Sequence, residues 1–280
     1  MNAIEIKGLN KHFKDFAIED LNLTVPSGCV VGLVGENGAG KSTTIKLILH
    51  MLFQDSGTVT ILGKDNVKEL DDVKEDIGVV FDECCFPKEL TADKVRKIMR
   101  AAYRQWDDAL FEEYMKRFDL PLKKTIGKFS RGMKMKLSIA VALSHHAKLL
   151  ILDEATSGLD PVVRDDIIDI LMDFTKEEDH SILISSHIVS DLEKACDYIA
   201  FLHKGKLVLC EEKDRLYEQY RVIHCDEQTL SAIPKEAVIG RKIGSFGAEA
   251  IVRQDAVPEG VQGYPIDIEK LFIFMVKESG

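Results

Sequence analysis

A glycine-rich stretch with a lysine and two hydroxyl side chains carries the strongest chemical signal in the sequence. It matches the pattern G-x-x-x-x-G-K-[ST] over Gly35, Glu36, Asn37, Gly38, Ala39, Gly40, Lys41, Ser42 and Thr43. Glycines let successive backbone N–H groups cradle phosphate oxygens, a lysine here reaches the β and γ phosphates, and the Ser42 hydroxyl is suited to bind Mg²⁺. The stretch lies between a strand pattern and a helical pattern, as a phosphate-binding loop requires, whereas the alternative is a chance glycine turn. We therefore predict a nucleoside triphosphate site.

Two adjacent carboxylates end a second apolar run. Leu149–Leu152 has the composition of a buried strand and is followed directly by Asp153 and Glu154. Residues in this position lie at the carboxyl edge of a parallel sheet, beside the phosphate-binding loop. We expect Asp153 to hold Mg²⁺, mostly through water, and Glu154 to polarise the attacking water as a general base. An acidic helix cap is the alternative, and it would be preferred if the glycine-rich loop were absent.

A histidine follows a third apolar run in the same way. His187 comes after the strand pattern of Ser181–Ile184, so we expect it on the same sheet edge as Lys41 and Asp153. There it is placed to donate a hydrogen bond to the γ-phosphate and to the attacking water. A lone histidine is more often structural or solvated, and the shared edge is what favours the functional interpretation.

Other polar residues are assigned structural roles. Asp160 precedes Pro161, and proline suits the first turn of a helix, so Asp160 is expected to cap that helix. His145 and His146 have no metal-ligating companions at a useful spacing and are interpreted as surface residues. The six cysteines show no CxxC spacing, which predicts free thiols, no structural disulfide and no zinc site.

The elements that would position these groups alternate between strand and helix patterns. Between Thr91 and Phe118 two amphipathic helical patterns follow each other without a strand, which indicates a helical insertion, although two surface helices of an α/β core would give the same pattern. From about Glu218 the sequence turns to short strand-like pieces separated by turn residues, without a chemical motif. The runs that look like buried strands are Cys29–Val34, Thr58–Leu62, Ile77–Phe81, Leu149–Leu152, Ser181–Ile184 and Tyr198–Leu202.

The composition narrows the class of protein. The chain has 280 residues, of which 45% are hydrophobic and 30% charged, as in ordinary globular proteins. Its formal net charge of −10 argues against a general binder of nucleic acid or of anionic membranes. The longest stretch without Asp, Glu, Lys or Arg is Leu21–Gly35, which contains Pro26 and Gly28 and is too short to cross a bilayer. Since the N-terminus lacks the pattern of a secretory signal, we expect the protein to stay in the cytoplasm.

Taken together, these residues resemble the nucleotide-binding domain of ABC transporters. The segment Phe129–Met133 resembles the signature loop of that family, and the resemblance implies that Ser130 and Gly132 contact the γ-phosphate held by a second subunit. Ser157–Asp160 resembles the loop that crosses the interface between two subunits, which places Asp160 among the nucleotide-site residues.

The resemblance also implies an aromatic side chain that stacks on adenine. Phe13 fits that position, and Phe16 is the competing candidate, whereas core packing is the alternative role for both.

The sequence departs from the family pattern at three places. Asp82 stands where the family has a glutamine, and a carboxylate there is able to ligate Mg²⁺ but cannot donate an N–H to the attacking water. Ala155 replaces a proline, which we expect to matter little. Arg131 and Met133 in the signature loop resemble variants of ABC-2 type exporters. Together with Asp82, they are similar to exporters of amphipathic or antimicrobial peptides, including phenol-soluble modulin exporters.

The fold implied by the resemblance is an α/β P-loop NTPase of the ABC type. It consists of a RecA-like core, an antiparallel β subdomain and an α-helical subdomain, with a small C-terminal α+β extension. The predicted boundaries are residues 1–217 for the ATPase domain, about 84–145 for its helical subdomain, and 218–280 for the accessory domain.

The function implied is that of an ATP-hydrolysing subunit that binds ATP and Mg²⁺. Two subunits, expected to be identical, would form a head-to-tail dimer and drive separate transmembrane permease subunits from the cytoplasmic face of the membrane, without nucleic acid. The transported molecules would be peptides or other amphipathic compounds. Two alternatives remain open at this point, a nucleotide-binding scaffold whose hydrolysis is impaired by Asp82, and a soluble ABC ATPase acting on ribosomes or DNA.

Overall fold

A computed structural model describes residues 2–244 and 247–278. Residues 1, 245–246 and 279–280 of the two predicted domains lie outside the described residues. The strands are β1 (Asn2–His12), β2 (Ala17–Pro26), β3 (Val30–Val34), β4 (Ser56–Ile61), β5 (Lys64–Asp65), β6 (Ile77–Val80), β7 (Leu149–Asp153), β8 (Ser181–Ser186), β9 (Tyr198–His203), β10 (Lys206–Glu212), β11 (Tyr220–Cys225), β12 (Val238–Gly244), β13 (Gly247–Arg253) and β14 (Gly263–Pro265). The α-helices are α1 (Lys41–Ile48), α2 (Leu70–Val73), α3 (Ala92–Ala102), α4 (Asp108–Arg117), α5 (Arg131–Leu143), α6 (Pro161–Phe174), α7 (Val189–Ala195), α8 (Lys213–Gln219), α9 (Glu227–Ala232) and α10 (Ile268–Glu278).

A six-stranded sheet in the order β10-β9-β3-β8-β7-β6 forms the centre of the molecule. The five strands from β9 to β6 are parallel, and β10 pairs with β9 in the antiparallel direction. Their residues are apolar on both faces because helices or a second sheet cover each side. The carboxyl ends of β3, β6, β7 and β8 therefore meet at one edge, and the chemical motifs follow these four strands.

A second, antiparallel sheet in the order β2-β1-β4-β5 packs beside the central sheet. One hydrophobic cluster joins its buried residues to α1 and to alternate residues of the central strands, such as Val31, Leu33 and Ile151. The intervening residues, such as Val30 and Leu152, belong to a cluster on the opposite face, as the two-residue period of a strand requires. The central sheet is thus buried between two cores.

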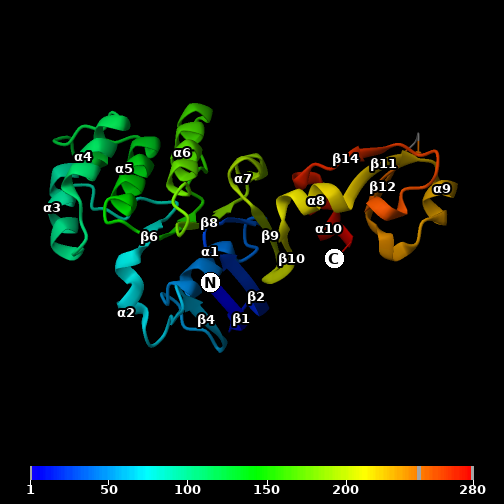
Figure 1. Ribbon diagram of the computed structural model, residues 1–280, viewed down its shortest axis with the longest axis horizontal. Helices are drawn as coiled ribbons and strands as arrows, with labels where there is room; N and C mark the ends of the chain where they lie inside the picture. The colour runs from blue at the N-terminus through cyan, green and yellow to red at the C-terminus, as the bar shows by residue number, and fades with distance from the viewer. Residues whose placement is uncertain (1, 245–246, 279–280) are drawn as a thin grey trace.

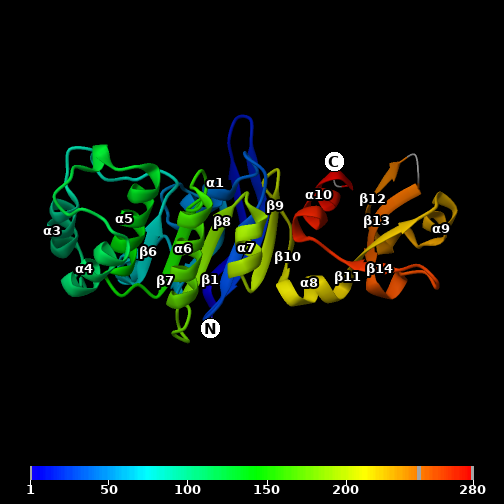
Figure 2. The same ribbon diagram turned by 90° about the horizontal axis from the view of Figure 1, so that it is seen from above.

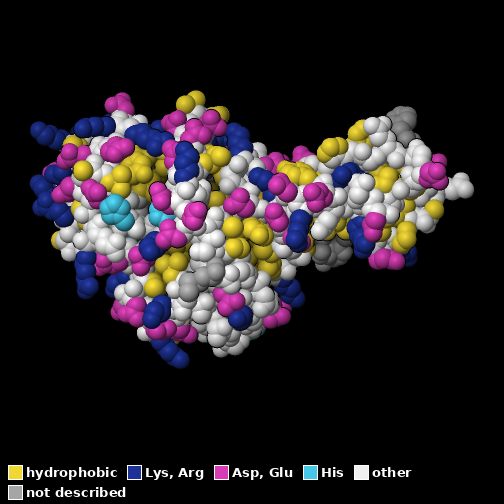
Figure 3. All heavy atoms as spheres, viewed as in Figure 1, with side chains coloured by type: hydrophobic (Ala, Val, Ile, Leu, Met, Phe, Trp, Pro, Cys, Tyr) yellow, Lys and Arg dark blue, Asp and Glu magenta, His cyan; other side chains and the backbone are white. Residues whose placement is uncertain are grey.

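Helices α3, α4 and α5 form a lobe at one end of the molecule, connected to β6 and β7 (Figure 1). Their buried side chains, including Val95, Phe111 and Leu137, join the cluster on the helical side of the sheet. This lobe corresponds to the helical insertion expected between Thr91 and Phe118 together with α5. Figure 3 shows that lysine and arginine side chains are concentrated on the outer surface of the lobe, and that hydrophobic side chains lie in the hollow between it and α6.

The C-terminal region forms a third sheet at the opposite end of the molecule, in the antiparallel order β12-β13-β11-β14 (Figure 2). Helix α8 leads into it from β10, and α10 returns to the ATPase core. The strand-like pieces predicted after Glu218 correspond to β11, β12 and β13. Helix α10 was not predicted, because the nearly continuous apolar run Leu271–Val276 hides the helical period.

The structure corrects the surface interpretation of one histidine. His145 is 1% exposed, its Nδ1 lies 3.0 Å from the carbonyl oxygen of Glu75, and its ring stacks on Tyr103 at a centroid distance of 4.1 Å. His146 is exposed as expected. Among residues 2–244 and 247–278, no helix is both long enough and apolar enough to span a membrane.

Candidate active site

The phosphate-binding loop connects β3 to the first turn of α1. Gly40 precedes the helix with φ of 110°, a conformation that favours glycine, and a Cβ there would lie 2.8 Å from the ring of Phe16. Lys41 is the first residue of α1, so the unpaired N–H groups of the helix face the loop. A loop and helix end of this kind is suited to bind a phosphate anion.

Lys41 is buried behind this loop and is only 5% exposed. Its Nζ donates to the carbonyl oxygen of Gly35 at 2.7 Å and forms an ion pair with Glu154 Oε1 at 3.1 Å. A buried ammonium group needs such partners, because desolvation without them is costly. The phosphate-binding lysine and the expected general base are thus in direct contact.

Asp153 is held by a serine from the neighbouring strand. Asp153 is 3% exposed at the end of β7, and Ser185 Oγ at the end of β8 donates to its Oδ1 at 2.6 Å. The same hydroxyl oxygen accepts a hydrogen bond from the backbone N–H of Glu154 at 3.1 Å. Ser185 therefore fixes both carboxylate-bearing residues relative to β8.

Glu154 lies between a cation and a histidine. Its Oε1 contacts Lys41, and its Oε2 lies 2.7 Å from His187 Nδ1. The backbone of Glu154 has φ of 53°, in the left-handed region that costs a non-glycine residue of order 1 kcal/mol. That turn, at the end of β7, is what aims the side chain at the phosphate-binding loop instead of continuing the strand.

A cavity of about 640 Å³ opens over these groups. It brings together the carboxyl ends of β3, β7 and β8 and the loop that follows β6, as the sequence predicted. The residues that line it are Asp15, Phe16, Glu36, Asn37, Gly38, Gly40, Lys41, Ser42, Thr43, Asp82, Arg131, Glu154, Ser157 and His187. It offers a phosphate-binding loop at one end and an aromatic ring, Phe16, beside it, which suits a nucleotide.

Comparison with known proteins identifies this arrangement. The sequence model described as "ABC transporter" matches residues 18–157. The ATP-binding protein YtrB of Bacillus subtilis (strain 168) is 34% identical over 218 residues, which cover 78% of this chain and 74% of YtrB. The chain belongs to the ABC transporter family. The lantibiotic transport ATP-binding protein SrtF of Streptococcus pyogenes is 34% identical over 222 residues, covering 75% of this chain and 91% of SrtF.

Solved structures agree with this assignment. The structure of an ATP-binding subunit of an ABC transporter has a TM-score of 0.69 at 29% identity and covers 76% of this chain and 91% of its own. A dimeric ATP-binding cassette in a post-hydrolysis state, bound to ADP and Pi, has a TM-score of 0.67 at 22% identity, covering 75% of this chain and 98% of its own, and supports the fold. The predicted fold and the assignment as an ABC ATPase subunit are confirmed.

Three site residues predicted for this ABC ATPase lie at helix starts outside its own cavity. Ser130 caps α5, and its Oγ accepts the N–H of Met133 at 3.2 Å, with Gly132 in the same first turn. Asp160 caps α6 by accepting the N–H of Val163 at 3.1 Å, as predicted. None of the three lines the nucleotide cavity of the same chain.

The two candidate adenine-stacking residues are placed differently. Phe16 lines the cavity and packs against Gly40. Phe13 is 43% exposed and stacks on the outer side of Phe16 at a centroid distance of 6.3 Å, without lining the cavity. The structure therefore brings Phe16, and not Phe13, to the edge of the phosphate-binding loop.

The oxygen groups near the loop suit a magnesium ion. Ser42 and Asp82 line the cavity, and the buried carboxylate of Asp153 lies at the end of the adjoining strand. Hydroxyl and carboxylate oxygens are the protein ligands that Mg²⁺ prefers. These three residues would hold the ion, which would neutralise charge on the phosphates when bound.

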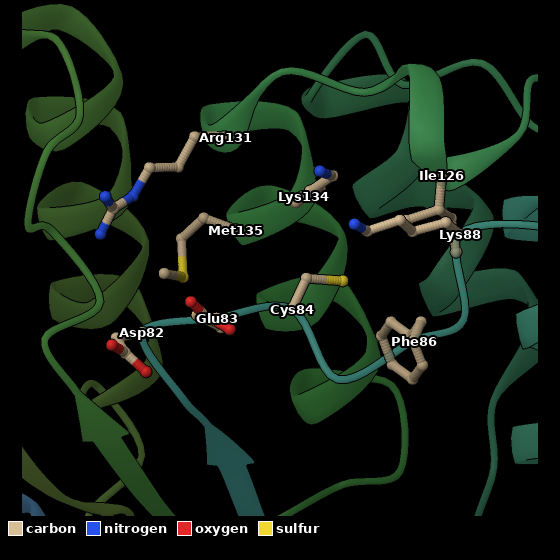
Figure 4. A pocket seen from close by; sticks show the side chains of 9 residues that line it. All are labelled: Asp82, Glu83, Cys84, Phe86, Lys88, Ile126, Arg131, Lys134 and Met135. Atoms are coloured by element: carbon tan, nitrogen blue, oxygen red, sulfur yellow. The ribbon is translucent and has the colours of Figure 1, made fainter.

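Asp82 and Arg131 also line a second cavity of about 380 Å³ next to the first (Figure 4). It lies between the loop after β6 and helix α5, and its other lining residues are Glu83, Cys84, Phe86, Lys88, Ile126, Lys134 and Met135. Two of the residues that depart from the family pattern therefore stand where the two cavities meet.

Sequence reasoning did not assign Ser185 to the site, and it placed Ser157 only in the predicted interface loop. Ser185 holds Asp153, and Ser157 lines the nucleotide cavity. The sequence feature that could have assigned Ser185 to the site was its position, since it follows an apolar strand pattern at the same sheet edge as the other motifs. Serine is too common at strand ends for that signal to be selective.

Proposed function

We propose that this ABC ATPase powers the export of peptides or other amphipathic molecules by cycles of ATP binding and hydrolysis. The proposal is carried by one observation, the contact of Glu154 with both Lys41 and His187 at the end of the phosphate-binding loop. The relatives add support for the cargo, because SrtF is described as a lantibiotic transport protein and another relative, BcrA, as a bacitracin transport protein.

ATP binding would rearrange the contacts of Lys41. The phosphates would take the lysine from Glu154, because two or more phosphate charges attract the ammonium more strongly than one carboxylate does. Glu154 would then accept a proton from the attacking water, and His187, already within 2.7 Å of it, would hold the water and the γ-phosphate in line. Mg²⁺ bound by Ser42, Asp153 and Asp82 belongs to the same proposal.

The partners proposed are a second copy of the chain and separate permease subunits. Ser130 and Gly132 lie outside the cavity of their own chain, so they would serve the nucleotide of a second copy packed head to tail. The second cavity, lined by Asp82, Lys88 and Arg131 among others, would receive a segment of the permease, and the protein would then work at the cytoplasmic face of the membrane.

The decisive experiment is steady-state ATP turnover of the purified chain with Glu154→Gln. Loss of the general base should reduce kcat by about 100-fold or more while ATP binding persists. Glu259→Gln, which changes an exposed glutamate of the C-terminal region, is the matched control and should leave turnover unchanged. Equal turnover of wild type and Glu154→Gln would refute the catalytic assignment of Glu154, and absence of turnover in both would favour a scaffold that only binds nucleotide.

The transport part of the proposal has its own test. The tagged chain should recover a polytopic membrane protein from detergent-solubilised membranes, and cells that carry Glu154→Gln should become more sensitive to amphipathic peptides. Recovery of ribosomal proteins instead would favour the soluble type of ABC ATPase.

A further inference from the structure

Helix α7 connects the catalytic histidine to the C-terminal region. It begins at Val189, two residues after His187, and Ser186 Oγ accepts the N–H of Ile188 at 2.9 Å in the connecting turn. This short connection leaves little freedom between the helix and the imidazole. The direction of α7 therefore influences where His187 points, and through it the 2.7 Å contact with Glu154.

Glu193, near the far end of α7, accepts hydrogen bonds from two separate elements that follow β10, helix α8 and the start of α10. Tyr217 Oη in α8 donates to its Oε1 at 3.3 Å, and the backbone N–H of Ile268 at the start of α10 donates to the same oxygen at 3.1 Å. A third bond runs from Lys213 Nζ to the backbone carbonyl oxygen of Glu193 at 2.8 Å. All three donors come from the residues after β10.

Apolar packing makes this attachment rigid. Leu271 and Phe274 of α10 are buried in the same hydrophobic cluster as Leu192 of α7. The ring of Phe272 packs against Phe201 of β9 at a centroid distance of 5.2 Å. The C-terminal sheet is therefore joined to the ATPase core by a continuous apolar contact, and is not held only by the chain that leads into it.

The Tyr217 hydroxyl remains a hydrogen-bond donor to Glu193 under physiological conditions. Burial, together with the neighbouring Glu193 carboxylate, raises the pKa of Tyr217 to about 12, so the hydroxyl keeps its proton. On its other side α7 packs against α6, where Lys194 pairs with Asp165 at 2.9 Å on the surface. Glu193 is thus the polar anchor of α7 toward the C-terminal region, whereas the solvent-exposed Lys194–Asp165 pair contributes little to the position of the helix.

We propose that Glu193 is a positioning residue for hydrolysis. By anchoring α7 to α8 and α10, it lets the C-terminal region set the place of His187 beside Glu154. The inference depends on the proposed ATPase cycle, in which His187 holds the attacking water.

The test compares Glu193→Ala with Glu193→Gln in the full chain. The alanine variant should lower kcat for ATP by about 5- to 10-fold with KM within about twofold of wild type, because the phosphate-binding loop is untouched. The glutamine variant keeps an acceptor oxygen and should recover most of kcat. Lys194→Ala, on the next residue but directed toward α6, is the matched control and should match wild type.

A second readout separates positioning from general destabilisation. Hydrogen exchange of the α7 amides should speed up in Glu193→Ala, while exchange in α1 stays as in wild type. Should the alanine variant fold poorly, Tyr217→Phe removes a single donor and should still lower kcat by about twofold at unchanged KM.

Three results would overturn the inference: a folded Glu193→Ala with wild-type kcat, a glutamine variant as slow as the alanine variant, or a loss of kcat matched by an equal rise in KM. If Glu154→Gln abolishes turnover but substitutions of Glu193 leave it unchanged, this inference is rejected and the proposed function stands. Absence of wild-type turnover would reject the proposed function itself.

Discussion

Lys41 shows how a single residue prepares the site for its substrate. Its buried ammonium group is satisfied by the carbonyl oxygen of Gly35 and the carboxylate of Glu154. The phosphates of a nucleotide would replace these contacts at a low cost in free energy, because the ammonium group of Lys41 would have an anionic partner before and after binding. The same exchange would free Glu154 for the attacking water, so binding and activation would be linked through one side chain.

Substitution of each of the two phenylalanines by alanine would identify the residue that stacks on adenine. Phe16→Ala should weaken ATP binding by about fivefold or more, because a base–aromatic stack contributes about 1–3 kcal/mol. Phe13→Ala should weaken it less, because Phe13 lies on the outer side of Phe16 and does not line the cavity. Binding of a fluorescent ATP analogue measures both, and thermal melting controls for lost packing. A larger effect of Phe13→Ala would assign the stack to Phe13.

At the scale of elements, the sequence predicted where motifs gather but not how each residue is buried. The strand ends after β3, β7 and β8 were predictable because each motif directly follows an apolar run, and parallel strands share one carboxyl edge. The burial of His145 was not predictable, because it depends on the carbonyl oxygen of Glu75 and the ring of Tyr103, which are distant in sequence. Helix α10 was missed for a different reason, since the apolar run Leu271–Val276 shows no helical period.

The burial of His145 has a measurable effect on the stability of the fold. Desolvation lowers the pKa of His145, so the folded protein resists taking up the proton that the unfolded chain accepts below about pH 6.5. The stabilisation it provides is therefore complete above pH 6.5 and is lost as the pH falls toward the lowered pKa of the folded state. Urea unfolding between pH 7.5 and 5 should show this decline.

A variant without the titrating ring isolates the contribution of His145. His145→Gln should be less stable than wild type at pH 7.5 and should lose less stability on acidification. His146→Gln, an exposed neighbour, should keep the wild-type pH profile. Identical profiles for wild type and His145→Gln would show that other groups cause the decline.

At the scale of the whole molecule, the phosphate-binding loop and the proposed signature residues lie at different places on the chain. The phosphate-binding loop and Glu154 line the cavity, whereas Ser130 and Gly132 lie at the start of α5 outside it. In a head-to-tail dimer each site would combine the loop of one chain with the signature residues of the other. Two inactive variants should then complement each other only if the halves meet across the interface.

Lys41→Ala and Gly132→Asp are suited to this test. The first removes the phosphate-binding ammonium group, and the second places a carboxylate where the γ-phosphate of the partner would lie. The space beside Gly132 admits a side chain, because an added Cβ would lie 3.4 Å from Val163, and an acidic residue suits the first turn of a helix. Both variants should therefore fold, and each should be inactive alone.

Mixing the two variants in equal amounts makes half of the dimers mixed if exchange is random. In a mixed dimer one site combines both defects, and the other combines the intact loop of the Gly132→Asp chain with the intact signature residues of the Lys41→Ala chain. ATP turnover should therefore return to about a quarter of the wild-type rate, provided that one site suffices. If each chain instead completed its own site, the mixture would remain inactive at every ratio, and the signature residues would have to act within their own chain.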